Sequence, residues 1–238
     1  MADAAVNPKD GAELVFVPGG AFQFGLTDDQ IVAVAERFPG AAPGYLDLMR
    51  AGRQVMLPDY WIYKHPVTVA QYRAFCKATG RFMPDSPAHI YEWPAKWTDR
   101  HPVTYIADAA AYAEWAGGAL PTEEQWEKAA RGVDGRLFPW GDELDTARFH
   151  STMKLYPRHP ATPCQIGLYP QSASPFGIED CCGNIAEWTS TKWSEDRLVL
   201  RGSTMHNLRG ENHLVTARAH ARVGECLNLV GFRVVFLG

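Results

Sequence analysis

The chain has 238 residues, of which 46% are hydrophobic and 21% charged, and its formal net charge is −4. This length can bury a substantial core, and the composition is ordinary for a globular protein. The sequence has no Lys/Arg cluster, no apolar run of the roughly 20 residues that cross a bilayer, and no apolar leader after Met1, so we expect a cytoplasmic protein with no nucleic-acid partner and no membrane insertion.

The N-terminal half predicts two short strands followed by helices with clear start signals. Residues 14–17 and 21–25 alternate around a Pro-Gly-Gly turn, which is typical of a strand pair. A threonine followed three residues later by glutamine opens each of three helices. These capping boxes begin at Thr27, Thr68 and Thr122, and the helices are expected to end near Pro39, Gly80 and Gly132.

The remaining elements are short and widely spaced. We predict a strand over 59–63 and a helix over 108–116, and we expect residues 133–193 to be mostly loops. Strands are predicted again at 197–201, 216–222 and 231–237, and the last should be buried because it is apolar on both faces. With 8 Trp, 21 Gly and 17 Pro spread along the chain, this pattern predicts an irregular, loop-rich α+β fold in one domain, residues 1–238.

The cysteines argue against a cross-linked scaffold. Their number is odd, two are adjacent, and no C-x-x-C pair is present. We therefore predict five free thiols rather than disulfides or a structural zinc site. They are Cys76, Cys164, Cys181, Cys182 and Cys226.

Several motifs occur in one characteristic order. They include LPTEEQWEKAARG (120–132), FPWGDE (138–143), PFGIEDCCGNIAEWTS (175–190), LVLRGS (198–203) and NLVGFRVV (228–235). Taken together, they resemble the formylglycine-generating-enzyme, or sulfatase-modifying-factor, domain family over nearly the whole chain. The resemblance implies a C-type-lectin-like fold, with short strands and a few short helices.

The resemblance also implies a structural calcium ion. The ligands would be the side chains of Asp180 and Glu187 and the carbonyl oxygens of Gly183 and Ile185. Calcium takes several oxygen ligands, and a glycine-containing loop allows carbonyls to turn toward a cation. The alternative is that the two carboxylates are solvated or form salt bridges.

The copper site of the formylglycine-generating enzymes has no counterpart here. In that family, a Cys-x-x-x-x-Cys pair follows the Gly-Ser turn and binds Cu(I), which prefers thiolate ligands. In this sequence the two positions fall on His206 and Glu211, or, one residue later, on Asn207 and Asn212. We therefore expect neither copper nor formylglycine-generating activity.

The segment 203–228 is the candidate ligand-binding region. The resembled family includes the variable proteins of diversity-generating retroelements, whose diversified positions lie between the Arg-Gly turn and the last strand. Such a surface combines adaptable polar residues with a rigid frame, and its partner would be an unidentified protein or small molecule. The candidates are Thr204, His206, Asn207, Arg209, Glu211, His213, Arg218, His220 and Asn228.

A divergent metal-dependent oxidase is the alternative function. His206, Glu211 and His213 have the residue types of a two-histidine, one-carboxylate metal site. Gly210 within this stretch indicates a loop, however, so the spacing alone does not bring the three side chains together. We favour the non-catalytic binding protein and expect these side chains to be exposed.

Overall fold

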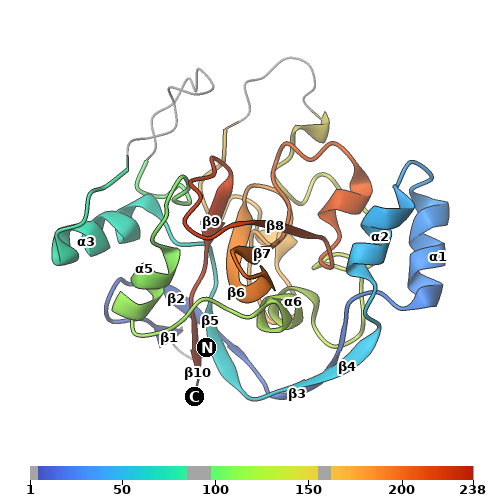
Figure 1. The fold of residues 1–238 in the computed structure, drawn as a ribbon, viewed down its shortest axis with the longest axis horizontal. Helices are drawn as coiled ribbons and strands as arrows, with labels where there is room; N and C mark the ends of the chain where they lie inside the picture. The colour runs from blue at the N-terminus through green and yellow to red at the C-terminus, as the bar shows by residue number, and fades with distance from the viewer. Residues whose placement is uncertain (1–4, 85–97, 155–161, 238) are drawn as a thin grey trace.

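A computed structural model describes residues 5–84, 98–154 and 162–237. Two four-stranded β-sheets lie between helices α3 (Val69–Thr79) and α5 (Ala109–Trp115) on one side and α1 (Asp28–Arg37) and α2 (Pro43–Met49) on the other (Figure 1). A two-stranded sheet runs along the lower edge of the same view. The described chain includes no helix that combines the length and the apolar character needed to span a bilayer. All five cysteines are free thiols, as predicted.

The helices are short. Apart from β4 and β5, the described strands lie near the two ends of the chain. The helices are α1 (Asp28–Arg37), α2 (Pro43–Met49), α3 (Val69–Thr79), α5 (Ala109–Trp115) and α6 (Glu123–Arg131). The strands are β1 (Ala5–Val6), β2 (Glu13–Val17), β3 (Gly20–Phe24), β4 (Arg53–Leu57), β5 (Tyr60–Tyr63), β6 (Ala186–Ser194), β7 (Arg197–Arg201), β8 (Arg218–Arg222), β9 (Val230–Phe232) and β10 (Val235–Leu237). Single 3₁₀ turns lie at Thr152–Lys154, Pro170–Ser172 and Gly210–His213.

The sheet topology brings the two ends of the chain together. One sheet has the order β1-β2-β5-β10, with all of its pairs antiparallel. The second is the β3-β4 pair, and the third has the order β8-β7-β6-β9, in which β6 and β9 are parallel. This mixed, loop-rich architecture confirms the predicted α+β fold class.

The three capping boxes form as predicted. At α6, for example, the Thr122 hydroxyl accepts a hydrogen bond from the backbone N–H of Gln125, whose side chain accepts from the Thr122 N–H. These contacts satisfy N–H groups that have no partner within the helix. Helix α3 ends at Gly80, which adopts a left-handed conformation with φ of 69° that favours glycine.

One strand was not predicted, and one predicted strand was wrong. Strand β6 covers the end of the stretch 133–193, whose other described residues are mostly loops as expected; its polar residues hide the alternation, and its first half is buried on both faces. The predicted strand 231–237 is two strands that pair in different sheets, β9 with β6 and β10 with β5. The chain changes sheets at Arg233, whose buried guanidinium forms an ion pair with Glu187.

The core between α3, α5 and the third sheet is aromatic. The rings of Tyr72 and Tyr112 stack with centroids 5.8 Å apart, and Phe232 meets Tyr112 edge-on at 5.2 Å. Trp188 pairs with Phe232 in the β6–β9 register, and both side chains are buried. These two residues therefore join strands β6 and β9 to the aromatic core.

We expect Phe232→Ala to lower the free energy of unfolding by about 3–5 kcal/mol, because it removes a fully buried ring and leaves a cavity. Phe82 is 85% exposed, so Phe82→Ala is the matched control and should change stability by no more than about 0.5 kcal/mol. Chemical denaturation of both variants measures the difference. Equal effects would contradict the core assignment.

Candidate functional site

The segment 203–228 packs against the two N-terminal helices rather than lying free on the surface. Tyr45 of α2 forms a side-chain hydrogen bond with Asn212. Arg218 of β8 donates a 3.2 Å hydrogen bond to the carbonyl of Leu48, and Arg209 donates to a carbonyl in the α1–α2 connection. Residues some 170 positions earlier in the sequence therefore help to hold the segment in place.

A hollow of about 230 Å³ lies between α2 and the third sheet. Three of the nine predicted binding residues line it, and neutral hydrogen-bonding groups form most of the remaining polar wall. The lining consists of Tyr45, Ala186, Leu200, Gly202, Ser203, Thr204, Asn207, Asn212, Arg218, Ala219 and Val230. Asn207 and Asn212, the second of the two possible positions of the absent cysteine pair, both line the hollow. None of the described lining residues is a cysteine or histidine.

The exposed members of the predicted set lie outside this hollow. His206 and Arg209 are exposed on the loop after β7. His220 is exposed on β8, where its ring lies 4.6 Å from that of Trp193 and its Nδ1 is 3.0 Å from Arg197 Nη1. Asn228 is half-buried, and its Oδ1 has no hydrogen-bond partner among the described residues.

Two predicted binding residues are buried, which corrects the expectation that they are exposed. The exposed fractions of Glu211 and His213 are 4% and 1%. Both belong to a 3₁₀ turn whose backbone brings their side chains inward. They hold the loop in place and do not present a surface to a ligand.

The side chain of His213 makes its hydrogen bonds within the loop. The Ser203 hydroxyl accepts from the Gly183 N–H at 2.8 Å and lies 2.7 Å from His213 Nδ1. The other ring nitrogen, Nε2, lies 2.9 Å from the carbonyl oxygen of Asn207. Both nitrogens are therefore engaged in hydrogen bonds. Within the described ranges, no group of three His, Cys, Asp or Glu side chains is placed to hold a metal ion.

The predicted calcium ligands have different environments. Glu187 is fully buried and accepts two 2.7 Å hydrogen bonds from Arg233 and one of 2.9 Å from Trp126. Asp180 is also buried, but its Oδ2 has no hydrogen-bond partner among the described residues. Burial raises the pKa of Asp180 to about 6. Asp180 therefore fits a cation ligand, whereas both oxygens of Glu187 already belong to an ion pair.

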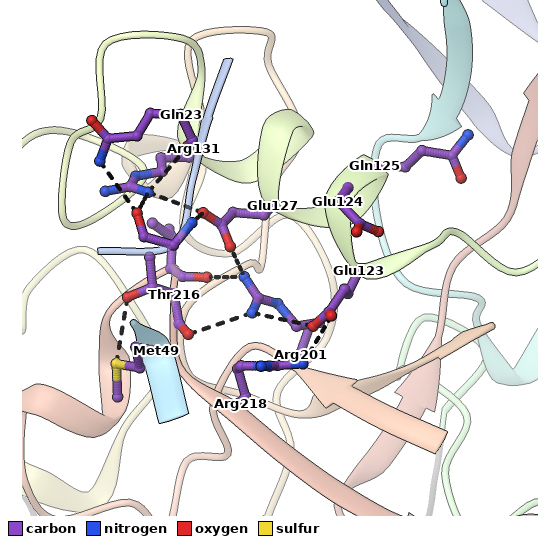
Figure 2. A network of polar contacts seen from close by, with 12 residues as sticks. Gln23, Met49, Glu123, Glu124, Gln125, Glu127, Arg131, Arg201, Thr216 and Arg218 are labelled. Carbon is purple, nitrogen blue, oxygen red and sulfur yellow. Dashed lines mark hydrogen bonds and ion pairs between the residues drawn. The ribbon is translucent and has the colours of Figure 1, made fainter. Parts of the chain in front are cut away.

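A buried network of charged side chains supports the floor of the site (Figure 2). Glu127 of α6 forms ion pairs with Arg131, at 3.0 Å, and with Arg201 of β7. All three side chains are fully buried. Since an unpaired charge in this environment would be very unfavourable, each guanidinium also donates to backbone carbonyls, Arg131 to Gly25 and Arg201 to Val215.

The network extends to the hollow through Glu123. Its carboxylate lies 2.8 Å from Arg218 and 3.9 Å from Arg201. Burial raises the pKa of Glu123 above its usual value, although the two arginines oppose this effect. Arg218 is thus both a member of the network and part of the lining of the hollow.

Sequence reasoning missed several residues that shape the site. Tyr45 lies in a helix that was not predicted, and its place in the hollow depends on contacts distant in sequence. Ser203 and Asn212 lie within the candidate segment but were not selected as binding residues. Asn212 could have been selected from the sequence, because it is one of the possible positions of the absent cysteine pair.

Fold and site together define a C-type-lectin-like domain without the paired thiolates of the copper oxidases. The family model for the sulfatase-modifying factor enzyme 1-like domain matches residues 1–236. The chain therefore belongs to the sulfatase-modifying factor enzyme 1-like domain family.

Two curated proteins have sequences similar to this chain. The chain is 32% identical to YfmG of Bacillus subtilis, over 79% of this chain and 43% of that protein. It is 30% identical to the formylglycine-generating enzyme of Thermomonospora curvata, over 80% and 75% respectively. It thus spans less than half of the first relative and three quarters of the second.

The fold is shared with PvdO from Pseudomonas aeruginosa, at a TM-score of 0.77 and 22% identity, over 98% of this chain and 97% of that one. It is also shared with variable protein 1 of Treponema denticola, at a TM-score of 0.71 and 16% identity, over 99% of each chain. At these identities the similarity shows a common fold.

We expect acid to destabilise the protein through His213. Burial lowers the pKa of His213 to about 4, from an ordinary value of 6.5. Because the unfolded chain binds a proton that the native imidazole does not, this contribution to stability is present above pH 6.5 and is lost as the pH falls toward 4. It amounts to about 2–3 kcal/mol.

Urea denaturation at pH 7 and pH 4.5 tests this expectation. The difference in unfolding free energy between the two pH values should be smaller in His213→Gln than in the wild type. His220→Gln serves as the control for removing a histidine from the segment. An unchanged pH dependence in His213→Gln would show that this imidazole does not titrate as its burial implies.

Proposed function

We propose that this protein is a non-catalytic binding protein, whose ligand contacts the hollow and the exposed residues around it. The observation that supports this most directly is the lining of the hollow. One of the two possible registers for the absent cysteine pair places it at the amides Asn207 and Asn212, and both of these line the hollow. Amide groups are adaptable hydrogen-bond donors and acceptors but are not the soft ligands that Cu(I) needs.

The retroelement variable proteins provide a specific form of this proposal. Treponema denticola variable protein 1 shares the fold, and the candidate segment lies just before the last strands, as in the resembled variable proteins. The segment is held by α2 and by the buried charges beneath it. Its exposed positions can therefore change without loss of the frame that orients them.

A gene-level comparison tests this form of the proposal. We expect a reverse-transcriptase gene nearby, together with a near-copy of the coding sequence for residues 203–228. Differences between the two copies should fall on codons for accessible residues and spare those for the buried side chains Glu211 and His213. The accessible positions are Thr204, His206, Asn207, Arg209, Arg218 and His220. The absence of such a copy, or frequent changes at His213, would contradict a retroelement origin.

A divergent oxidase is the second candidate, because the chain is 30% identical to a formylglycine-generating enzyme over most of its length. Elemental analysis of the purified protein separates the two functions. We expect no stoichiometric copper or iron, and we expect His206→Ala, Glu211→Ala and His213→Ala to leave the metal content unchanged. A bound transition metal that these variants release would overturn the binding-protein proposal.

Structural calcium remains a prediction, now centred on Asp180. We expect a chelator to lower the melting temperature of the wild type and not that of Asp180→Asn, because an ion bound only by the native state stabilises it. The variant retains the size of the side chain and removes its charge.

If Asp180 binds no cation, the two proteins should differ in the opposite direction. Without a cation, ionisation of the buried Asp180 between its ordinary pKa of 3.8 and its native pKa of about 6 opposes folding. Asp180→Asn would then be more stable than the wild type at pH 7, by up to about 3 kcal/mol. That result, with no effect of the chelator on either protein, would rule out calcium at this position.

A further inference from the structure

We propose that strand β4 is the contact surface of a symmetric dimer, in which the free edges of two copies of this chain pair as antiparallel strands. This inference does not depend on the proposed binding function. Two observations support it: the unpaired backbone groups along β4 and the order of the side chains within the strand.

The outer edge of β4 presents backbone hydrogen-bonding groups to solvent. The carbonyl oxygens of Gln23 and Gly25 point away from β4, because both accept hydrogen bonds from Arg131. Gln23 lies opposite Gln54 in the β3–β4 register, and opposite residues of an antiparallel pair point either toward each other or away. The backbone groups of Gln54 and Met56 therefore face outward. In the described part of the chain, no hydrogen bond reaches them from outside β3.

The other edge of the same two-stranded sheet is closed. Lys128 of α6 donates to the carbonyl oxygens of Pro18 and Gly20, at 2.7 and 3.0 Å. Arg131, one turn later in the helix, donates to that of Gln23. A two-stranded sheet with one closed edge and one open edge can pair only once. Association through β4 should therefore stop at a dimer and not continue as a fibre.

The end strands of the two larger sheets are less suited to pairing with themselves. A two-fold axis at the middle of β8 would place Arg218 opposite Arg222 of the second copy, and like charges directly opposite each other are destabilising. Glu225 also occupies the outward backbone groups of Arg222. Strand β10 is partly covered, because Val235 exchanges two backbone hydrogen bonds with Ala119.

Strand β4 has no such conflict. A two-fold axis at Val55 places Gln54 opposite Met56 of the second copy, so that each pair exchanges two backbone hydrogen bonds. The charged residue of the strand, Arg53, is paired at 3.0 Å with Glu124 of its own chain and would face an apolar residue. The Met56 side chain is 73% exposed, and pairing would cover it. The two small sheets would thus join into one larger antiparallel sheet, which is more stable than an isolated pair of strands.

Sedimentation of the full chain over a range of concentrations provides the test, with hydrogen exchange as a second measurement. We expect a dimer that dissociates on dilution. The amide protons of Gln54 and Met56 should exchange more slowly as the dimer forms, because they become hydrogen-bonded.

Two double variants test the register of the pairing. Gln54→Lys with Met56→Lys places lysine opposite lysine in both pairs and should raise the dissociation constant by more than about tenfold. Gln54→Glu with Met56→Lys places opposite charges in the same pairs and should retain the dimer. Ala21→Lys is the control and should also retain it. Ala21 is exposed and lies opposite Met56 on β3, away from the free edge.

Met56→Pro provides a further variant if the lysine variant does not fold. It removes an N–H group that β3 does not use, which an edge strand tolerates, and it should also weaken the dimer. A wild type that stays monomeric at millimolar concentration would overturn the inference. So would a dimer that is unchanged in the lysine or proline variant, or one that the opposite charges disrupt as strongly as the like charges.

Discussion

The carboxylate of Glu127 connects parts of the chain that are distant in sequence. It accepts a 2.7 Å hydrogen bond from the N–H of Gly25 and pairs with Arg131 in its own helix and with Arg201 in β7. One side chain therefore joins α6, the end of β3 and the third sheet. Removal of one partner from such a buried pair costs about 3–5 kcal/mol, because the remaining charge is left uncompensated. Glu187, Trp126 and Arg233 form a comparable junction that joins α6 to β6 and to the crossing between β9 and β10.

This buried frame explains how a loop-rich domain can hold a defined site. The segment after β7 has few backbone ladder contacts of its own until β8 begins. It is instead held from below by Arg201, which donates to the carbonyls of Val215 and Thr216, and from the side by α2. His213 adds a connection between Ser203 and Asn207 within the loop. Polar residues that project from these fixed points lose little conformational freedom when a ligand binds, which favours affinity.

Local signals in the sequence were sufficient for part of this structure. Each capping box depends on two residues three positions apart, and all three helices began where the threonines indicated. The family motifs indicated the fold because they occur in a characteristic order along nearly the whole chain. Strand β6 and helix α2 were missed, since polar composition and tertiary packing decide them. The burial of Glu211 and His213 could not be predicted either, because it depends on a 3₁₀ turn and on partners elsewhere in the fold.

The candidate segment 203–228 contains both exposed and buried side chains, and this difference bears on the choice between a binding protein and an oxidase. His213, one of the three candidate metal ligands, uses both ring nitrogens to hold the loop, so recruiting it as a ligand would break its contacts with Ser203 and Asn207. The polar part of that wall consists of one arginine, two amides and three hydroxyl groups. Such groups bind ligands by hydrogen bonds and charge, and a guanidinium disfavours a metal cation nearby. The composition of this wall is therefore our reason for favouring a binding protein over an oxidase.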